Sequence, residues 1–475
     1  MKVFFRGRLT SFSLRVMAFA ALIVSLATLP VSSAAYASSL TILHTFCSQT
    51  NCTDGDMPYS GMISDSGGNY YGTTNGGGPQ NAGVIYQLSP DVSRTKWTYK
   101  VIYNFCSTNS LTQTCTDGEN PDSGNLAIDA SGTFYGTTAR GGNTNNGVVY
   151  SLSYDAKSGQ WKQNVIYSFC SKANCADGWR PSGHVTLDNS GNIYGTTGSG
   201  GVFTNSGSVY KLTHNASKTK WTESIIYKFC LKVGCKDGSI PVGGLLLKSS
   251  GNLFGVTISG GAGKYGNGGT IFELSPAAPG ARWTESVLYR FCSQPECTDG
   301  TNPGGGLDGG VTLISDAKGN LFGTALQGGV QTNPSCQSLN GCGLVFELAR
   351  PASGAKWSYS SLHRFCTDAK CVDGASPMTG LTEDSNGNLY GTTWSGGIYG
   401  YGSIYKLTPN VAHTVWSEQV LYSFCALNVN SYSCLDGVAP AGTVSIDKTG
   451  ALFGAATRYG DKYEYSAGTL YRLTP

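Results

Sequence analysis

The sequence contains little charge and little histidine for its length. Asp, Glu, Lys and Arg make up 13% of the 475 residues, and only five residues are His. No stretch repeats apolar residues every 3.6 positions for long enough to form a substantial helix. Beyond Leu29, no apolar run approaches the roughly 20 residues that a membrane-spanning helix needs. These absences argue against a helical fold and against a membrane span in the main body of the chain.

Residues that favour strands and turns are abundant instead. The chain has 66 Gly and 27 Tyr, and Thr and Val are frequent. This composition is typical of a turn-rich, all-β protein. One compact core of this length would be unusual, whereas a repeat array relaxes that limit because each unit packs only on its neighbours.

The N-terminus has the organisation of an export signal. Basic residues precede an uncharged apolar run from Val16 to Leu29, and the small-x-small sequence Ala35-Tyr36-Ala37 follows it. We therefore predict a signal peptide over residues 1–37 and secretion of the rest. The alternative, an uncleaved membrane anchor, is disfavoured because the run is shorter than about 20 residues.

The charge of the exported chain bears on its partners. Cleavage would remove four basic residues (Lys2, Arg6, Arg8 and Arg15) and no acid, which changes the formal net charge from +3 to −1. This balance argues against nucleic acid, whose binding depends on a basic surface. The chain also ends at Pro475 without an apolar tail. We expect a released, monomeric protein without membrane insertion.

One motif recurs seven times in the rest of the chain. It reads Phe-Cys, a short loop, and Cys-x-Asp-Gly-x-x-Pro, and successive copies are 59 to 74 residues apart. Its Asp residues are Asp54, Asp117, Asp177, Asp237, Asp299, Asp373 and Asp436. Each copy continues through four β-rich segments separated by Gly, Asn and Asp turns, as in Gly387-Asn388-Leu389-Tyr390-Gly391-Thr392-Thr393. Four such segments predict a four-stranded antiparallel sheet.

Seven units of about 62 residues match the blades of a β-propeller. An open solenoid has much shorter rungs, and a string of separate domains would need linkers. We therefore predict an all-β, seven-bladed propeller with four-stranded antiparallel blades, in one domain over residues 38–475. The order Pro-x-Gly-x-apolar-x-Asp-x-x-Gly-Asn-x-Tyr is similar to that of NHL-type propeller repeats, which implies that the strand after the Pro is innermost.

The two ends of the chain predict how the ring closes. The segment from Leu40 to Phe46 is a copy of an outer strand, whereas the chain stops after the third-strand copy Leu470-Tyr471-Arg472-Leu473. The last blade therefore lacks its own outer strand. We predict that the N-terminal segment supplies it, which leaves no open sheet edge.

The recurring motifs resemble those of the GloVer tandem-repeat proteins, also called choice-of-anchor tandem repeat proteins. The resemblance rests on Gly-Asn-x-Tyr/Phe-Gly-Thr-Thr, the Gly-Gly that follows, and Gly-x-Ile/Val-Tyr/Phe-x-Leu. It covers nearly all of residues 40–475. The family implies an exported bacterial protein, often with a C-terminal anchor, and carries no established activity.

The sixteen cysteines form one close pair per repeat and one pair in the longest insertion. An even count at fixed local spacing in an exported chain predicts disulfides. The predicted bridges are Cys47–Cys52, Cys106–Cys115, Cys170–Cys175, Cys230–Cys235, Cys292–Cys297, Cys336–Cys342, Cys366–Cys371 and Cys425–Cys434. Zinc is the alternative, but it needs about four converging ligands, and we expect the blades to hold the pairs apart. We predict no metal site and no cofactor.

The repeated acids and the histidines offer weak candidates for chemistry. Each Asp-Gly loop supplies one carboxylate, which suits a turn cap better than calcium, whose sites use six to eight oxygens. The same holds for the acids before the inner hairpin, such as Asp188, and Lys248 replaces that acid in the fourth copy. His44 and His363 replace an outer-strand Tyr. Only His184 lies on a predicted inner strand, where it could face the channel.

Departures from the repeat are the better functional candidates, because what all blades share is usually packing. These departures are Trp179, Arg180, Trp394, Tyr399, Tyr401 and Arg458, with Arg140 in an equivalent loop. Exposed aromatic residues on rigid loops suit sugar stacking or protein contact. We expect these loops to share one face of the propeller, opposite a face of tight turns such as Asp188–Gly191.

Two functions are consistent with this pattern. The first is a secreted, non-enzymatic binding or scaffold propeller for an extracellular glycan or protein. The second is a secreted lyase or hydrolase that acts at the mouth of the channel. The fold does not choose between them, and no catalytic residues are identified in the sequence.

Overall fold

The computed structural model describes Met1 and residues 38–107, 115–121, 124–200, 206–276, 282–305, 312–330, 332–337, 340–352, 355–430, 433–458 and 467–475. The predicted signal peptide lies outside these ranges apart from Met1. Ser38–Pro475 form one compact unit. Among the described residues, no helix has the length and apolar character of a membrane span.

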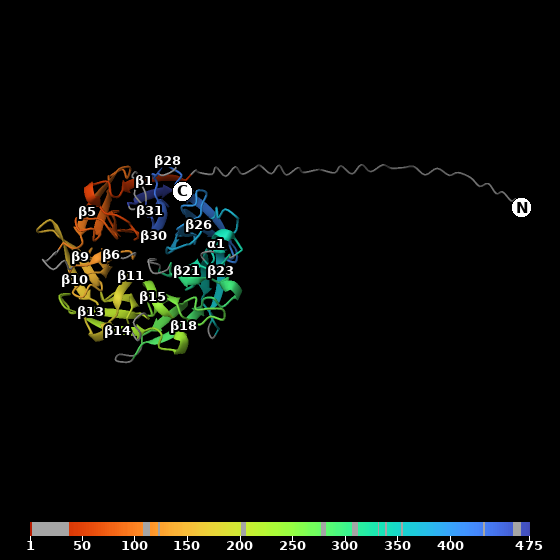
Figure 1. Cartoon of the computed structure of the whole chain (residues 1–475), viewed down its shortest axis with the longest axis horizontal. Helices are drawn as coiled ribbons and strands as arrows, with labels where there is room; N and C mark the ends of the chain where they lie inside the picture. Colours follow the sequence, from red (N-terminus) through yellow and green to blue (C-terminus); the bar gives the residue numbers. More distant parts are fainter. Residues whose placement is uncertain are drawn as a thin grey trace, which may run out of the picture. The chain divides into compact units, whose positions relative to one another are not determined.

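The repeat encodes one sheet of four antiparallel strands. Blade 3 contains β11 (Trp179–Leu187), β12 (Ile193–Ser199), β13 (Ser208–His214) and β14 (Trp221–Lys228), side by side in that order. Seven such sheets are arranged around a central axis (Figure 1). The predicted seven-bladed propeller is confirmed, and the strand after the Pro lies at the inner end of each sheet.

The other blades repeat this order with small variations in the inner strand. Blade 1 has β2 (Ile63–Ser64), β3 (Tyr70–Thr74), β4 (Val84–Pro90) and β5 (Trp97–Asn104). Blade 2 has β6 (Glu119–Pro121), β7 (Ala127–Ile128), β8 (Phe134–Arg140), β9 (Val148–Asp155) and β10 (Gln160–Ser168). Blade 4 has β15 (Ser239–Leu247), β16 (Leu253–Ser259), β17 (Thr270–Ser275) and β18 (Thr284–Arg290).

Blades 5 to 7 complete the ring. Blade 5 has β19 (Thr301–Pro303), β20 (Ile314–Ser315), β21 (Leu321–Gln327), β22 (Leu344–Ala349) and β23 (Ser358–Arg364). Blade 6 has β24 (Thr382–Glu383), β25 (Leu389–Thr393), β26 (Ser403–Pro409) and β27 (Trp416–Ser423). Blade 7 has β30 (Val438–Ile446), β31 (Leu452–Arg458), β32 (Thr469–Thr474) and β1 (Ser39–Thr45).

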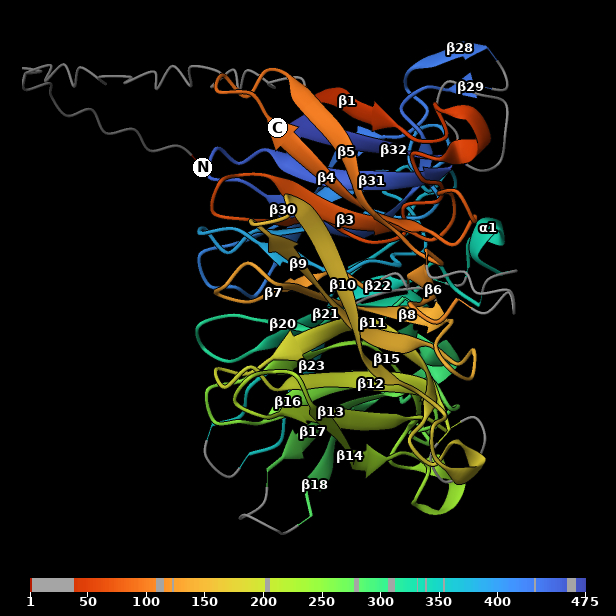
Figure 2. The same cartoon turned by 90° about the vertical axis from the view of Figure 1, so that its left-hand side faces the viewer.

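The first strand of the chain closes the last blade, as predicted. β1 pairs antiparallel with β32, with Leu40 opposite Leu473 and Thr45 opposite Thr469. Figure 2 shows the red β1 next to the blue β32. Phe46, which follows β1, is fully buried. The closure therefore removes a sheet edge and also fills the core beside blade 1.

The glycine of each Gly-Thr-Thr sequence makes room for an aromatic ring on the third strand. In blade 3, a Cβ on Gly195 would lie 2.3 Å from the hydroxyl oxygen of Tyr210, and Tyr210 is fully buried. Blade 4 has the same arrangement with Gly255 and Phe272. Because Phe replaces Tyr there, the ring rather than the hydroxyl is what this position requires.

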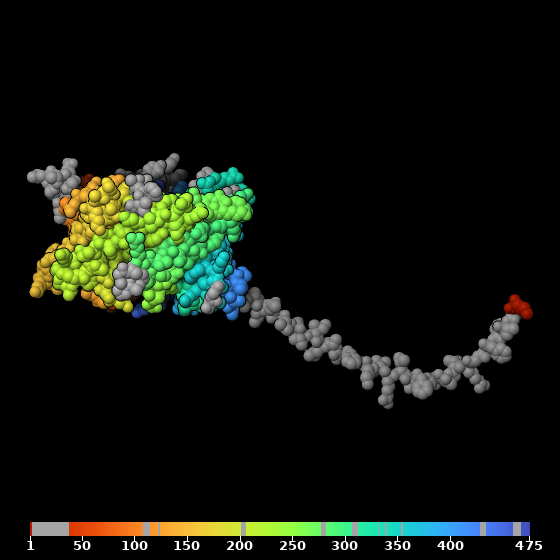
Figure 3. Space-filling model, turned by 90° about the horizontal axis from the view of Figure 1, so that it is seen from below, coloured from red at the N-terminus to blue at the C-terminus, as the bar shows by residue number. Residues whose placement is uncertain are grey.

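The strands alternate direction, so the connections divide into two faces. We call the loop face the one that carries the disulfide loops, such as 170–178, and the connections between second and third strands, such as 141–147. The turn face carries tight hairpins, such as 188–192. Figure 2 shows α1 (Pro334–Gln337) and the hairpin β28 (Asn428–Asn430) with β29 (Ser433–Cys434) on the same side, the loop face. Figure 3 shows the third to fifth blades packed into a continuous side wall.

The disulfide loops carry the remaining short helices and seven of the predicted bridges, and the eighth, Cys336–Cys342, lies in the connection between β21 and β22. Four loops contain one 3-10 turn each, at η1 (Thr50–Cys52), η2 (Ala173–Cys175), η3 (Val233–Cys235) and η4 (Pro295–Cys297). The structure joins the sixteen cysteines in the eight expected local pairs. This outcome follows from the short spacing, because each pair closes a loop of five to nine residues.

Candidate functional site

The seven Asp residues of the Asp-Gly loops are structural caps. The carboxylate of Asp177 accepts hydrogen bonds from the Ser171 and Lys172 backbone N–H groups (2.9 and 3.3 Å) and from the Tyr167 hydroxyl (2.8 Å). In two blades a His replaces that Tyr, and His44 Nε2 lies 3.3 Å from the Asp54 carboxylate. Burial raises the pKa of Asp54, but hydrogen bonds from His44, Ser48 and the backbone outweigh burial and lower it to about 2. These carboxylates are therefore committed to their loops.

The acids of the inner hairpins are also engaged locally. Asp188 accepts hydrogen bonds from the backbone and side chain of Asn192 (2.9 and 2.8 Å) and from the Tyr194 hydroxyl (3.1 Å). In blade 4, Lys248 replaces the acid, and Phe254 replaces the Tyr that would bond to it. The turn is kept in blade 4, where the Gly251 N–H donates to the Lys248 carbonyl oxygen at 2.8 Å, so the hairpin forms without this acid.

Two of the predicted binding residues meet in a polar cavity on the loop face. Trp179 and Arg180 begin β11, and Arg140 ends β8 in the neighbouring blade. We call this cavity the loop-face groove; its volume is about 500 Å³. It is lined by Asn75, Asn120, Ala139, Arg140, Asn145, Asn146, Trp179 and Arg180. Its lining residues come from blades 1, 2 and 3, so the groove forms only when neighbouring repeats are packed together in the ring.

A repeated backbone conformation positions Arg180 in this groove. Arg180 has a φ of 57°, and its N–H donates to the Asn146 carbonyl oxygen of blade 2 at 3.0 Å. Asn120 has the same conformation one blade earlier, with a φ of 53° and a bond from its N–H to the Ala82 carbonyl oxygen. This position therefore ties each blade to the previous one and presents a side chain at the inner rim of the loop face.

The asparagines of the groove were not singled out from the sequence. Asn120 occupies the same repeat position as Arg180, and its Nδ2 donates to the Asn75 carbonyl oxygen at 2.9 Å. A comparison of the seven copies position by position, rather than by unusual residues alone, would have drawn attention to it. Asn145 and Asn146 lie in a loop whose sequence carries no comparable signal.

Trp394 and Arg458 form a second group on the loop face. The Arg458 guanidinium carbon lies 5.4 Å from the centre of the Trp394 ring. The Tyr59 ring, which no sequence pattern singled out, is nearly parallel to that of Trp394 with centroids 6.4 Å apart. Tyr399 and Tyr401 lie in the loop after β25 and are 50% and 45% exposed. Trp179 and Trp394 thus belong to separate groups, as their positions in the third and sixth blades predict.

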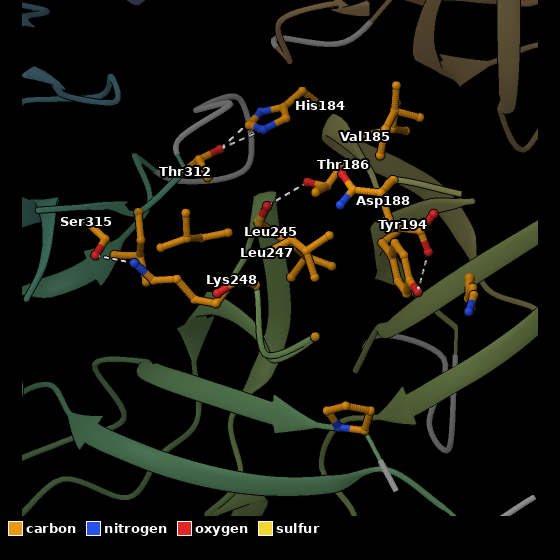
Figure 4. Close-up of a pocket in the computed structure, with 18 of the residues that line it drawn as sticks. His184, Val185, Thr186, Asp188, Tyr194, Leu245, Leu247, Lys248, Thr312 and Ser315 are labelled. Carbon is orange, nitrogen blue, oxygen red and sulfur yellow. Dashed lines mark hydrogen bonds between the residues drawn. The ribbon is translucent and has the colours of Figure 1, made fainter. Parts of the chain in front are cut away.

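A cavity larger than the loop-face groove lies on the turn face, where only tight turns were expected (Figure 4). This turn-face cavity has a volume of about 1010 Å³ and is bounded by the inner strands and hairpins of blades 3, 4 and 5. His184 lies at its inner end, and its ring nitrogens are 3.0 and 3.2 Å from the Thr312 hydroxyl oxygen. The ring fits there because blade 4 has Gly244, whose added Cβ would lie 2.1 Å from His184 Cε1.

The turn-face cavity combines a neutral imidazole with amines and aromatic walls. Burial lowers the pKa of His184 to about 4, so the ring is neutral near pH 7. Burial also lowers the pKa of Lys248, whose Nζ donates to the Ser315 hydroxyl. Lys211 lies over the ring of Tyr194 at 5.1 Å, and Trp283 forms part of the wall. Thr312, Lys211 and Trp283 were not selected from the sequence, because their proximity depends on three different blades.

One expectation about the cysteines is wrong. The blades were expected to hold the pairs apart, but the bridges Cys336–Cys342 and Cys366–Cys371 are in contact, with all four sulfurs within 4.8 Å of one another. All four residues are at most 5% exposed. The insertion in blade 5 reaches the next disulfide loop, and Asn333 Nδ2 donates to the Cys371 sulfur at 3.6 Å. The insertion thereby brings together sulfurs that the regular repeat would separate.

Comparisons with known proteins describe the repeat and the fold. A family model described as the Gloeobacter/Verrucomicrobia repeat matches residues 106–333 and 222–435. No curated protein matches the chain. A fungal alcohol oxidase of the AA5 family in complex with copper is similar in structure at 11% identity, with a TM-score of 0.50 over 91% of this chain and 76% of that one.

A second solved structure is more distant. It is the calcium structure of a Trichoderma reesei protein of carbohydrate-active enzyme family AA12, at 13% identity and a TM-score of 0.41 over 93% of this chain and 96% of the other. At these identities the likeness to the oxidase concerns the fold alone.

Proposed function

This chain belongs to the Gloeobacter/Verrucomicrobia repeat family, and we propose that it is an exported binding propeller whose loop-face groove holds an extracellular glycan. The observation that carries the proposal is the meeting of Trp179, Arg180 and Arg140 in one polar cavity. An indole face stacks on the apolar face of a sugar ring, while guanidinium and amide groups bond to its polar substituents. No histidine or carboxylate is among the lining residues, so the groove suits binding better than acid–base catalysis.

The size and polarity of the groove favour a glycan over a protein. A stable protein–protein interface buries about 800 Å² on each partner and has an apolar centre. The groove instead is a concave site of about 500 Å³ with four asparagines in its lining. Such a site fits a few sugar units of a chain that continues over the surface.

The eight disulfides support export. Local bridges of this kind persist in oxidising compartments and are rare where thiols are kept reduced. Each bridge lies in a loop-face connection, so the bridges also stiffen the loops that present the groove. A rigid groove loses less entropy on binding.

The test is retention of the purified protein on a panel of polysaccharides. Wild-type protein should be retained, and Trp179→Ala should weaken retention by up to about tenfold, since a stacking contact of this kind contributes up to ~1.5 kcal/mol. Tyr265→Ala is the matched control, because Tyr265 is a 47% exposed aromatic residue outside the groove. Retention of no glycan, or equal loss in both variants, would contradict the proposal; capture by a protein alone would favour that other class of partner.

A second function, an enzyme acting at the turn-face cavity, is favoured by one observation. His184 is neutral and lies at the inner end of a cavity of about 1010 Å³ that also contains Lys248. A neutral imidazole beside an amine is able to accept a proton while the amine binds an anion. Release of soluble products from a polysaccharide, abolished by His184→Asn but unchanged by Trp179→Ala, would support this enzyme; binding without products speaks against it.

A further inference from the structure

The two arginines of the loop-face groove have no partner within the part of the chain that the structure describes. Neither the Arg140 nor the Arg180 guanidinium donates a hydrogen bond or forms an ion pair there, whereas Lys172 and Lys232 are each paired with a glutamate. Both arginines are exposed. Glu119 lies opposite Arg140 in the pairing of β6 with β8 but forms no ion pair with it. The groove therefore presents two uncompensated positive charges.

These charges are concentrated at one junction of the ring. Arg180 occupies the repeat position held elsewhere by Met57, Asn120, Ile240, Asn302, Ser376 and Ala439. Arg140 occupies the position held elsewhere by Gly76, Ser199, Ser259, Gln327, Ser395 and Arg458. Only the junction of blades 2 and 3 has arginine at both positions. Because most copies have a neutral residue at each position, packing of the repeat does not account for the two charges.

The rest of the groove is neutral and held in place. The Asn145 side-chain oxygen accepts a hydrogen bond from the Gly141 N–H at 2.9 Å, and Asn146 Nδ2 donates to the Thr144 carbonyl oxygen at 2.8 Å. The lining contains no acid, so nothing in it repels an anion. Guanidinium groups bind carboxylates and sulfates through paired N–H donors.

We propose that the loop-face groove selects acidic glycans: Arg140 and Arg180 bind a uronate carboxylate or a sulfate ester, and Trp179 stacks on the same or the adjacent sugar ring. This inference rests on the proposed function and adds the chemical class of its ligand. The formal net charge of the whole chain is only +3, and −1 without residues 1–37, so general attraction to polyanions is weak. Selectivity has to come from the groove itself.

The experiment is affinity electrophoresis of the intact protein in gels that contain alginate, dextran sulfate or amylose. Alginate offers carboxylates, dextran sulfate offers sulfate esters, and amylose is neutral. We expect retention by an acidic polymer and weakening as salt is raised, because screening reduces the contribution of exposed charges. Arg140→Gln and Arg180→Gln should each lower affinity for that polymer by about tenfold. Arg282→Gln, an exposed arginine of the turn-face connection before β18, should change nothing.

The outcomes separate this inference from the function on which it rests. Equal, Trp179-dependent binding of amylose and alginate would overturn the acidic selectivity and leave the glycan-binding function standing. Equal weakening by Arg282→Gln would also overturn it, as a sign of non-specific attraction. Binding of no polysaccharide at all would overturn both the acidic selectivity and the glycan-binding function. Preference between alginate and dextran sulfate decides which anion the arginines accept.

Discussion

One position on the outer strand shows how single residues meet a shared requirement. The Gln163 Nε2 and the Tyr359 hydroxyl each donate to the carbonyl oxygen of an Asp-Gly aspartate in the preceding loop, at 2.8 and 2.7 Å. Glu418 occupies this position in blade 6, where its Oε1 is buried without a partner among the described residues. Burial raises the pKa of Glu418 to about 7. A donor at this position bonds to that carbonyl oxygen, whereas an ionised carboxylate has no proton to donate; Glu223 and Glu285 occupy the same position in blades 3 and 4, where each is paired with a lysine.

Glu418→Gln should therefore stabilise the protein at pH 8. A carboxyl group whose pKa is higher in the folded than in the unfolded chain contributes stability below about pH 4.5, and that contribution is lost as pH rises through about 7. We expect a gain of about 1–2 kcal/mol at pH 8 and little change at pH 4, measured by chemical unfolding. Glu223→Gln is the control. This variant should gain less stability at pH 8, because the substitution also removes the ion pair between Glu223 and Lys172.

The contact between two disulfides predicts exchange between them. Cys371→Ser would leave the Cys366 thiol within 4.8 Å of both sulfurs of the Cys336–Cys342 bridge. The Cys366 thiolate attacks one of these sulfurs, a new bridge forms, and the other sulfur leaves as a thiolate. Peptide mapping without reduction should find Cys366 bridged to Cys336 or Cys342. Cys235→Ser is the control: no second bridge contacts that loop among the described residues, so Cys230 should stay a free thiol.

At the scale of elements, β1 is the strand that decides whether the ring is closed. It pairs with β32 over six register positions, and Phe46 packs with Tyr86 and Phe453 in the core between blades 7 and 1. Without β1, blade 7 would expose a sheet edge and the core would lose a fully buried ring. The first strand of the folded chain therefore contributes to the stability of the ring in the same way as the strands within each repeat.

Deletion of residues 38–46 should lower the free energy of unfolding by about 5 kcal/mol or more, since it removes the strand and Phe46 together. Phe46→Ala alone should cost about 3–5 kcal/mol. Thermal and urea unfolding measure both. Val92→Ala, at a fully exposed side chain in a turn-face hairpin, is the neutral control. An unchanged melting temperature after the deletion would contradict the closure.

At the scale of the whole molecule, the inner strands pack so closely that neighbouring blades meet backbone to backbone. A Cβ on Gly183 would lie 2.3 Å from the Gly243 carbonyl carbon of the next blade. A Cβ on Gly124 would lie 2.1 Å from the Gly183 carbonyl carbon. Seven blades share one axis, so a shift of any one of them displaces the others.

Gly183→Ala should consequently destabilise the whole ring. Gly183 and Gly132 both have positive φ angles, 73° and 80°, but a Cβ on Gly132 would meet nothing within 4 Å. Gly132→Ala should cost about 1 kcal/mol for its backbone conformation alone, and Gly183→Ala about 3 kcal/mol or more. The difference between the two free energies of unfolding measures the packing around the axis. Equal losses of unfolding free energy in the two variants would show that the ring accommodates the added methyl group of Gly183→Ala without a packing penalty.

Features that depend on neighbouring residues or on the repeat were predictable from the amino-acid order alone. The seven copies predicted seven blades, the two chain ends predicted the pairing of β1 with β32, and the close Cys pairs predicted every bridge. The Asp-Gly carboxylates were correctly interpreted as caps, because their partners lie within one loop. Trp179 and Arg180 were recognisable as departures from the repeat.

Which residues of different blades meet became evident only in the folded ring. Arg140 lines the same groove as Trp179, and the Tyr59 ring lies near the Trp394 ring. Thr312 lies beside His184 although 128 positions separate the two in the sequence. The turn-face cavity and the contact between two disulfides were missed for the same reason. A repeat fixes the shape of each blade, whereas distances between blades depend on the curvature of the closed ring and on glycines such as Gly244, whose missing side chain leaves room for His184.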